Sequence, residues 1–355
     1  MNRRLDGVDA LKAVASQLIV LHHLAFYGPM SDHASALAPV VFDWLAQHGR
    51  LAVQVFLVVG GFLAARRLEP ALFRDGGPSI GRLLLDRYLR LAIPLAAMLV
   101  IAIAAAALAR GWMTHDSVPG APQPGQVIAH LLLLQDLLAV EALSAGVWYV
   151  SIDFQLFALL VLLLAVCGAL ERSFGWRRPI APWAVLALMG AALFHFNRDA
   201  DWDVAAPYFF GSYGLGVLAA WWGRAPNRRV GGLLLCAALV GAALAFEFRS
   251  RIALAGIVAL VLVMWSDARL PIGEAGRALV NWLARISYAV FLVHFPVCMV
   301  VNAAFDRFAS DAVAVQGLGV LLAWAASVGA GALFHRHVEQ RAAHWLGRAA
   351  RPATV

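Results

Sequence analysis

Charged residues are scarce in this sequence of 355 residues: Asp, Glu, Lys and Arg make up 14%, whereas soluble domains carry about 25%. Hydrophobic residues make up 62%, and the mean hydropathy is +0.76. This composition excludes an ordinary soluble domain and predicts a polytopic membrane protein. The net charge of +7 does not indicate nucleic-acid binding, because the arginines are spread between apolar runs instead of gathering on one basic face.

Cysteine is also rare, and metal-binding patterns are missing. Cys167, Cys236 and Cys298 lie far apart and within apolar runs, which excludes a disulfide framework and a zinc-binding spacing. The sequence contains no H-E-x-x-H motif, no Walker loop and no paired C-x-x-C motif. We therefore expect no metal cofactor.

Long apolar runs fill most of the chain. Backbone groups in lipid must be bonded within the chain, and the runs are too continuous for the alternation of a β-barrel, so each run predicts a helix. The fold prediction is an all-α, polytopic membrane bundle of about ten transmembrane helices. The predicted spans are 10–28, 50–66, 89–109, 147–168, 181–196, 205–222, 230–246, 251–266, 286–303 and 314–334.

The basic residues are distributed unevenly between the connections. With these spans, 22 of the 28 Lys and Arg residues fall on one side of the membrane. The positive-inside rule then places both termini in the cytoplasm. We expect residues 1–355 to form a single integral membrane domain, in which residues 335–355 are a basic cytoplasmic tail.

The first span carries polar groups at both ends. Lys12 and His23 are eleven steps apart, so on a helix they share nearly one face about 16 Å apart. An intramembrane histidine is a functional candidate, and a neutral imidazole is suited to act as a general base. The alternative is a histidine that only bonds a neighbouring helix. His22 points to another side of the helix and is the second candidate.

Two further polar clusters lie in other spans. Arg87 and Arg90 are three residues apart at the predicted cytoplasmic surface, where they can bind phosphates or simply anchor the helix. Asp153 lies within the fourth span and requires a histidine or arginine partner there. Asp153 and its partner would then either take part in the function or form a purely structural ion pair.

Five short motifs, in order, resemble those of acyltransferase family 3, the integral membrane O-acyltransferases. Lys12 stands where the family has arginine, Gln54 where an acid is common, Gly60 where it has serine, and Asp153 where it has glutamate. The matching stretches are Asp9-Ala10-Leu11-Lys12-Ala13 with His23, Phe56 to Phe62, Arg87 to Arg90, Trp148 to Phe157, and Ser287 to His294.

The resemblance implies a multi-pass enzyme of the bacterial inner membrane. It would move an acyl group, by default acetyl, from cytoplasmic acyl-CoA to a hydroxyl of a surface or periplasmic glycan or glycolipid. We expect His23 to be the general base and Asp153 to stabilise its imidazolium, with an acyl-histidine relay as the alternative. Lys12, Arg87 and Arg90 would hold the donor. Trp148, Tyr288 and His294 would line the acceptor side or only pack.

Other functions remain open from the sequence. A proton-coupled transporter or flippase for an anionic or glycolipid substrate would use His23 and Asp153 as a proton relay and would leave its substrate covalently unchanged. A membrane scaffold without chemistry is the third possibility, which the buried polar groups disfavour.

Overall fold

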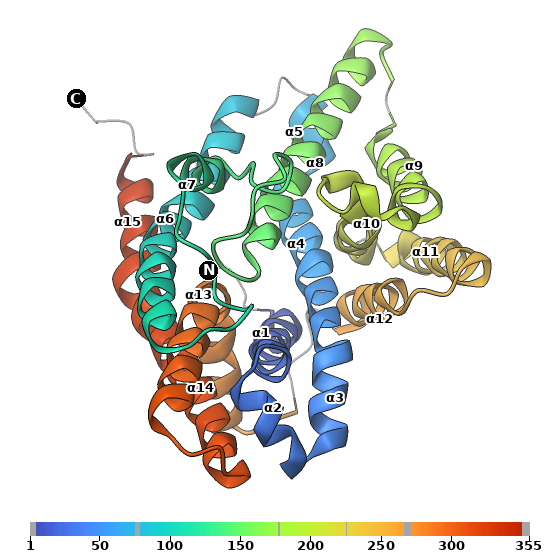
Figure 1. Cartoon of the computed structure of the whole chain (residues 1–355). Coiled ribbons are helices and arrows are strands. Elements are labelled where there is room, and N and C mark those ends of the chain that lie inside the picture. The colour runs from blue at the N-terminus through green and yellow to red at the C-terminus, as the bar shows by residue number, and fades with distance from the viewer. Residues whose placement is uncertain (1–4, 75–78, 177, 225, 266–270, 350–355) are drawn as a thin grey trace. The chain divides into compact units, whose positions relative to one another are not determined.

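The structure is a computed structural model that describes residues 5–74, 79–176, 178–224, 226–265 and 271–349. These residues form helices joined by turns and loops, and none of them lies in a β-strand (Figure 1). The all-α fold predicted from the apolar runs is therefore confirmed.

Fifteen α-helices are distinguished among the described residues. Their bounds are α1 (Asp6–Phe26), α2 (Met30–Ala34), α3 (Pro39–His48), α4 (Val53–Arg67), α5 (Pro70–Arg74), α6 (Ile80–Trp112), α7 (Pro124–Leu131), α8 (Val147–Ser173), α9 (Ala181–Phe194), α10 (Ala206–Gly223), α11 (Pro226–Phe246), α12 (Ser250–Trp265), α13 (Glu274–Phe308), α14 (Val313–Phe334) and α15 (Gln340–Ala349).

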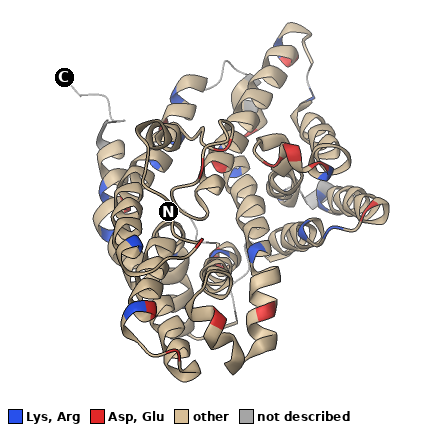
Figure 2. Ribbon diagram, viewed as in Figure 1, with Lys and Arg blue, Asp and Glu red and all other residues tan. Residues whose placement is uncertain are grey.

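Each of the ten predicted spans overlaps a helix, and residue 266 of the span 251–266 lies outside the described residues. Six helical stretches of the described chain are long and apolar enough to cross a membrane, or up to seven if the bent pair formed by α1 and α2 counts as one span. Figure 2 shows long parts of the ribbon without a charged residue. The structure thus has the apolar helices of a multi-pass membrane protein. The count of ten spans and the cytoplasmic termini stay predictions.

The chain divides into two compact units. Unit 1 comprises Met1–Lys12, Val53–Tyr88 and Ile152–Asn281, and unit 2 comprises Ala13–Ala52, Leu89–Ser151 and Trp282–Val355. Each unit therefore combines segments that are distant in the sequence. The prediction of one domain over residues 1–355 stays a prediction.

Unit 1 is built around α10, which packs against α4, α9, α11 and α12. Helix α10 lies closest to α4, at a crossing where both helices have glycine. A Cβ on Gly216 would overlap with the carbonyl oxygen of Val58, and a Cβ on Gly61 would overlap with that of Tyr213. These two glycines therefore let the backbones of α4 and α10 touch, as small residues do in membrane helix pairs.

Unit 2 has its core between α1, α2, α13 and α14. Val20 and Leu24 of α1, Val290 of α13 and Ala323 of α14 belong to one cluster of buried residues. A second cluster joins α6 to α13 through small side chains, among them Ala106 and Ala303. These contacts fix α13 beside α1, which positions the polar residues described below.

The connection between α6 and α8 contains the apolar stretch 126–140, for which we expect a re-entrant or surface helix. Only α7 forms there, and it ends at Leu131. The buried His130 closes the following turns, because its Nδ1 bonds the carbonyl of Gln126 at 2.8 Å and its Nε2 accepts from the amide of Leu143 at 3.1 Å. Burial lowers the pKa of His130, which favours the neutral ring that these two bonds require.

The predicted tail continues the last span without a break. A π-helical turn, His335–Glu339, joins α14 to α15, so that residues 313–347 form one helical stretch. Residues 350–355 of the tail lie outside the described residues, as do Arg3, Arg4, Arg177 and Arg269 of the charge count.

Candidate active site

Two histidines of unit 2 meet inside the bundle. Nδ1 of His23, on α1, lies 2.6 Å from Nε2 of His294, on α13. The ring planes differ by 5° and the ring centres are 4.9 Å apart. That separation is close to the N···N distance plus the radii of both rings, so the rings meet edge to edge in one plane instead of stacking. The contact is a directed hydrogen bond.

The backbone of α13 sets the protonation pattern of this pair. Nδ1 of His294 lies 2.8 Å from the carbonyl oxygen of Phe291, which can only accept a hydrogen bond. His294 therefore carries its proton on Nδ1 and presents Nε2 as an acceptor. His23 must then donate from its own Nδ1. Neutral His23 is left with Nε2 unprotonated, which is the atom a general base needs.

The neighbouring histidine has a different role. His22 is buried, and its Nδ1 donates to the carbonyl of Leu45 at 2.9 Å. A Cβ on Gly49 would lie 2.7 Å from the Cβ of His22, so the chain packs tightly around it. His23 keeps partial exposure. This arrangement favours His23 over His22 as the functional residue.

Aromatic rings surround the histidine pair. Tyr27 and Phe295 lie beside the ring of His23, at 5.5 and 6.3 Å between ring centres. Tyr149, at the start of α8, contacts the ring of Phe291 at 5.3 Å. The same ring packs on Gly146, which has a φ of +84° and would place a Cβ 3.2 Å from it. Glycine is therefore required at that turn.

Asp153 pairs with Arg87 within unit 1. Oδ2 of Asp153 accepts a hydrogen bond from the Arg87 guanidinium at 2.5 Å, and their side chains are 8% and 31% exposed. The guanidinium also lies over the ring of Phe157 at 5.3 Å. The expectation that an arginine or a histidine partners Asp153 is confirmed, and the partner is the arginine.

Gly60 leaves space beside this ion pair. A Cβ at Gly60 would lie 3.5 Å from the Tyr213 ring and 3.7 Å from Oδ1 of Asp153, which is ordinary contact. Six residues earlier on α4, nearly two turns away, Gln54 accepts a hydrogen bond from Ser212 at 2.6 Å. The family's serine at position 60 would fit there and would face the carboxylate.

The other predicted site residues lie as follows. Lys12 is partly buried near the start of α1, and Arg90 is exposed on α6, one turn after Arg87. Tyr288 points its hydroxyl toward the carbonyl of Leu91, at 3.4 Å. Trp148 is partly exposed and contacts the ring of Tyr149. Of these candidate residues, the structure brings together His23 with His294 and Arg87 with Asp153.

From the sequence, His294 is predicted to line the acceptor side or only to pack, and its bond to His23 is not predicted. Its position inside an apolar span marks it as a candidate, but the sequence does not reveal that α13 packs against α1. Among the described residues, no group of three or more His, Cys, Asp or Glu side chains is arranged to hold a metal ion.

Comparison with known families agrees with the motifs. The model of acyltransferase family 3, described as an acyltransferase domain, matches residues 5–334. No curated protein and no solved structure matches the chain. The matched range includes the ion pair of Arg87 and Asp153 and the pair of His23 and His294, and it ends at the last residue of α14. The chain belongs to acyltransferase family 3.

Proposed function

We propose that this membrane acyltransferase moves an acyl group from acyl-CoA, with acetyl-CoA as the default donor, to a hydroxyl of a glycan or glycolipid. The acceptor lies at the outer face of a bacterial inner membrane. The observation that supports this reaction best is the bond from His23 to His294, because it leaves Nε2 of His23 as a proton acceptor.

In this proposal His23 is the catalytic base. Its Nε2 takes the proton of the acceptor hydroxyl while the oxygen attacks the thioester carbonyl. The new C–O bond forms, the C–S bond breaks, and the departing thiolate takes the proton back from the imidazolium. His294 is a positioning residue, since its Nε2 accepts a stronger hydrogen bond once His23 becomes cationic. The stabilising role expected for Asp153 stays a prediction.

The donor requires cationic groups for its phosphates. Lys12, Arg87 and Arg90 supply an ammonium and two guanidinium groups, and guanidinium suits phosphate because it offers parallel N–H donors. Arg90 is exposed, whereas Arg87 already bonds Asp153. Trp148 and Tyr288 are proposed to line the acceptor side.

Mass spectrometry of cell-surface glycans tests the reaction directly. Cells that express the protein should carry a glycan heavier by one acyl group, and cells with His23→Ala should not. Isotope-labelled acetyl-CoA supplied to inverted membrane vesicles should pass its label to the same glycan. Translocation of an unmodified substrate would instead support the transporter reading, and an unchanged glycan profile would refute the proposed reaction.

Loss of Arg87 should weaken donor binding. We expect Arg87→Ala to raise the KM for acyl-CoA about tenfold, because the donor loses one charge-assisted hydrogen bond. Asp153→Asn is the matched control, because it disrupts the same ion pair but keeps the guanidinium. Both variants should lower the melting temperature, and only Arg87→Ala should change KM strongly. Equal KM values in the two variants would assign Arg87 to structure alone.

A further inference from the structure

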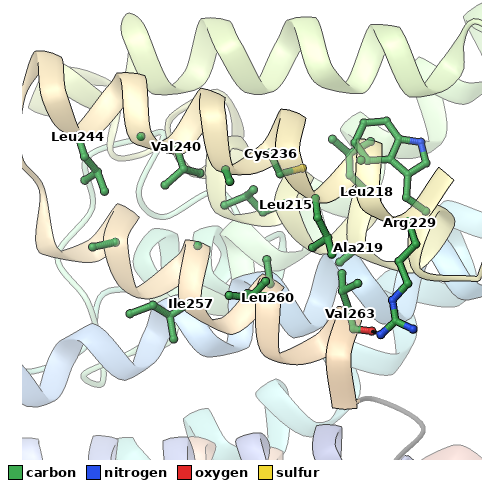
Figure 3. A pocket seen from close by; sticks show the side chains of 18 residues that line it. Leu215, Leu218, Ala219, Arg229, Cys236, Val240, Leu244, Ile257, Leu260 and Val263 are labelled. Atoms are coloured by element: carbon green, nitrogen blue, oxygen red, sulfur yellow. Dashed lines mark hydrogen bonds between the residues drawn. The ribbon is translucent and has the colours of Figure 1, made fainter.

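Unit 1 contains a groove away from its ion pair. Leu215, Leu218 and Ala219 of α10 form its floor, and α11 and α12 form its walls (Figure 3). The cavity has a volume of about 420 Å³, within the range of about 300–1,000 Å³ that is usual for small-molecule sites. The lining is almost entirely aliphatic, so a ligand must bring an apolar body.

A positively charged side chain, that of Arg229, lies at one end of this groove. Arg229 lies at the end opposite Leu244, and its guanidinium donates to the carbonyl of Val263 at 2.5 Å (Figure 3). A guanidinium has five N–H donors, so this bond leaves capacity for an anionic group. A ligand that complements the groove is therefore amphiphilic, with a long apolar part and a negative head.

The groove opens toward the outside of the helices. Ile257 and Leu260, which line it, are 59% and 47% exposed. Helix α11 is a candidate membrane span from Arg229 to Phe246, and only 17% of that span is buried. Apolar side chains exposed on a membrane span face lipid, so a lipid molecule can enter from the side. Arg229, at the end of the span, lies at the level of the headgroups.

We propose that the groove binds an anionic phospholipid of the surrounding bilayer, with an acyl chain between α11 and α12 and its phosphate at Arg229. The groove from Arg229 to Leu244 extends over fifteen helical steps, or about 22 Å. One leaflet contributes about half of the roughly 30 Å hydrocarbon core. A whole acyl chain therefore fits along the groove. The site is separate from the acyl-transfer residues and does not depend on them.

Trp222, which lines the groove, provides the probe. The full chain is reconstituted in phosphatidylcholine nanodiscs, and phosphatidylglycerol with brominated acyl chains is titrated in. Bromine quenches tryptophan on contact. The chain has 12 tryptophans, so the signal of Trp222 is the difference between wild type and Trp222→Phe. We expect this difference signal to be quenched at about one tenth of the mole fraction that brominated phosphatidylcholine requires.

Arg229→Gln should abolish the preference for the anionic lipid. Arg224→Gln is the control, because Arg224 bonds Glu69 at 2.9 Å and does not line the groove, and it should keep the preference. Equal quenching by both lipids, or a preference that survives Arg229→Gln, would overturn the proposal. If Arg229→Gln does not fold, the wild-type contrast between the lipids decides. Competition by soluble glycerol phosphate would show that the headgroup alone is bound, which also contradicts a lipid site.

Discussion

His23→Ala is expected to abolish acyl transfer while the protein remains in the membrane. Removal of a general base costs about 10²–10⁴-fold in rate, and the neighbouring His22 is a poor substitute because its ring is buried. The relevant measurement is the transfer of labelled acetyl from acetyl-CoA by purified protein, with the melting temperature recorded for each variant.

The neighbouring histidine provides a matched control. His22→Ala removes a buried ring that bonds Leu45, so it should lower stability and leave a folded fraction with nearly normal turnover. His294→Ala should slow transfer about 10- to 100-fold, since His23 keeps its ring but loses the bond that fixes its tautomer. Full activity in His23→Ala would show that His23 is not the general base. The same conclusion would follow if folded His22→Ala were inactive while His23→Ala remained active.

Gly61→Ala is expected to be among the most damaging single-methyl changes in unit 1, together with Gly216→Ala at the same crossing. The new methyl would overlap with the backbone carbonyl of Tyr213, which cannot rotate away like a side chain. Helices α4 and α10 must separate or shift, at a cost of about 3 kcal/mol, the upper end of the usual range for overpacking. The melting temperature in detergent should fall by about 6–12 °C.

Substitution of the adjacent Gly60 is the control for Gly61→Ala. A Cβ there would have ordinary contacts with Tyr213 and Asp153, so Gly60→Ala should change the melting temperature by less than about 2 °C. Gly60→Ser, the residue usual in the family, should be tolerated as well. If Gly60→Ala and Gly61→Ala are equally harmful, the close crossing of α4 and α10 does not explain the requirement for glycine.

The helices could be predicted from the sequence because each apolar run must bond its own backbone in lipid. The motifs likewise predict His23, Arg87 and Asp153 as site residues without knowledge of the fold, and these roles stay predictions. The pairing of these residues was harder to predict. Asp153 needed a cationic partner, and the sequence offered both histidines and arginines. Only the packing of α8 beside Arg87 shows that the partner is this arginine.

The position of α13 was the main missing element. His294 could be recognised as an intramembrane polar residue, but its bond to His23 depends on the packing of the buried cluster to which Val290 and residues of α1 belong. Neither hydropathy nor charge encodes such contacts, because any apolar helix face could pack there. The groove beside Arg229 cannot be predicted from the sequence for the same reason, because the helices that form its walls have the composition of ordinary apolar spans.

The bond between His23 and His294 also sets a condition on the biogenesis of the protein. The two residues are 271 positions apart in the chain. At about 5–20 residues per second, translation of that interval takes roughly 15–50 s. During this time α1 is in the bilayer without the acceptor that its histidine later bonds. Formation of the histidine pair therefore waits until α13 has been translated. A chain released before α13 is complete would lack this pair, however well its first helices are inserted.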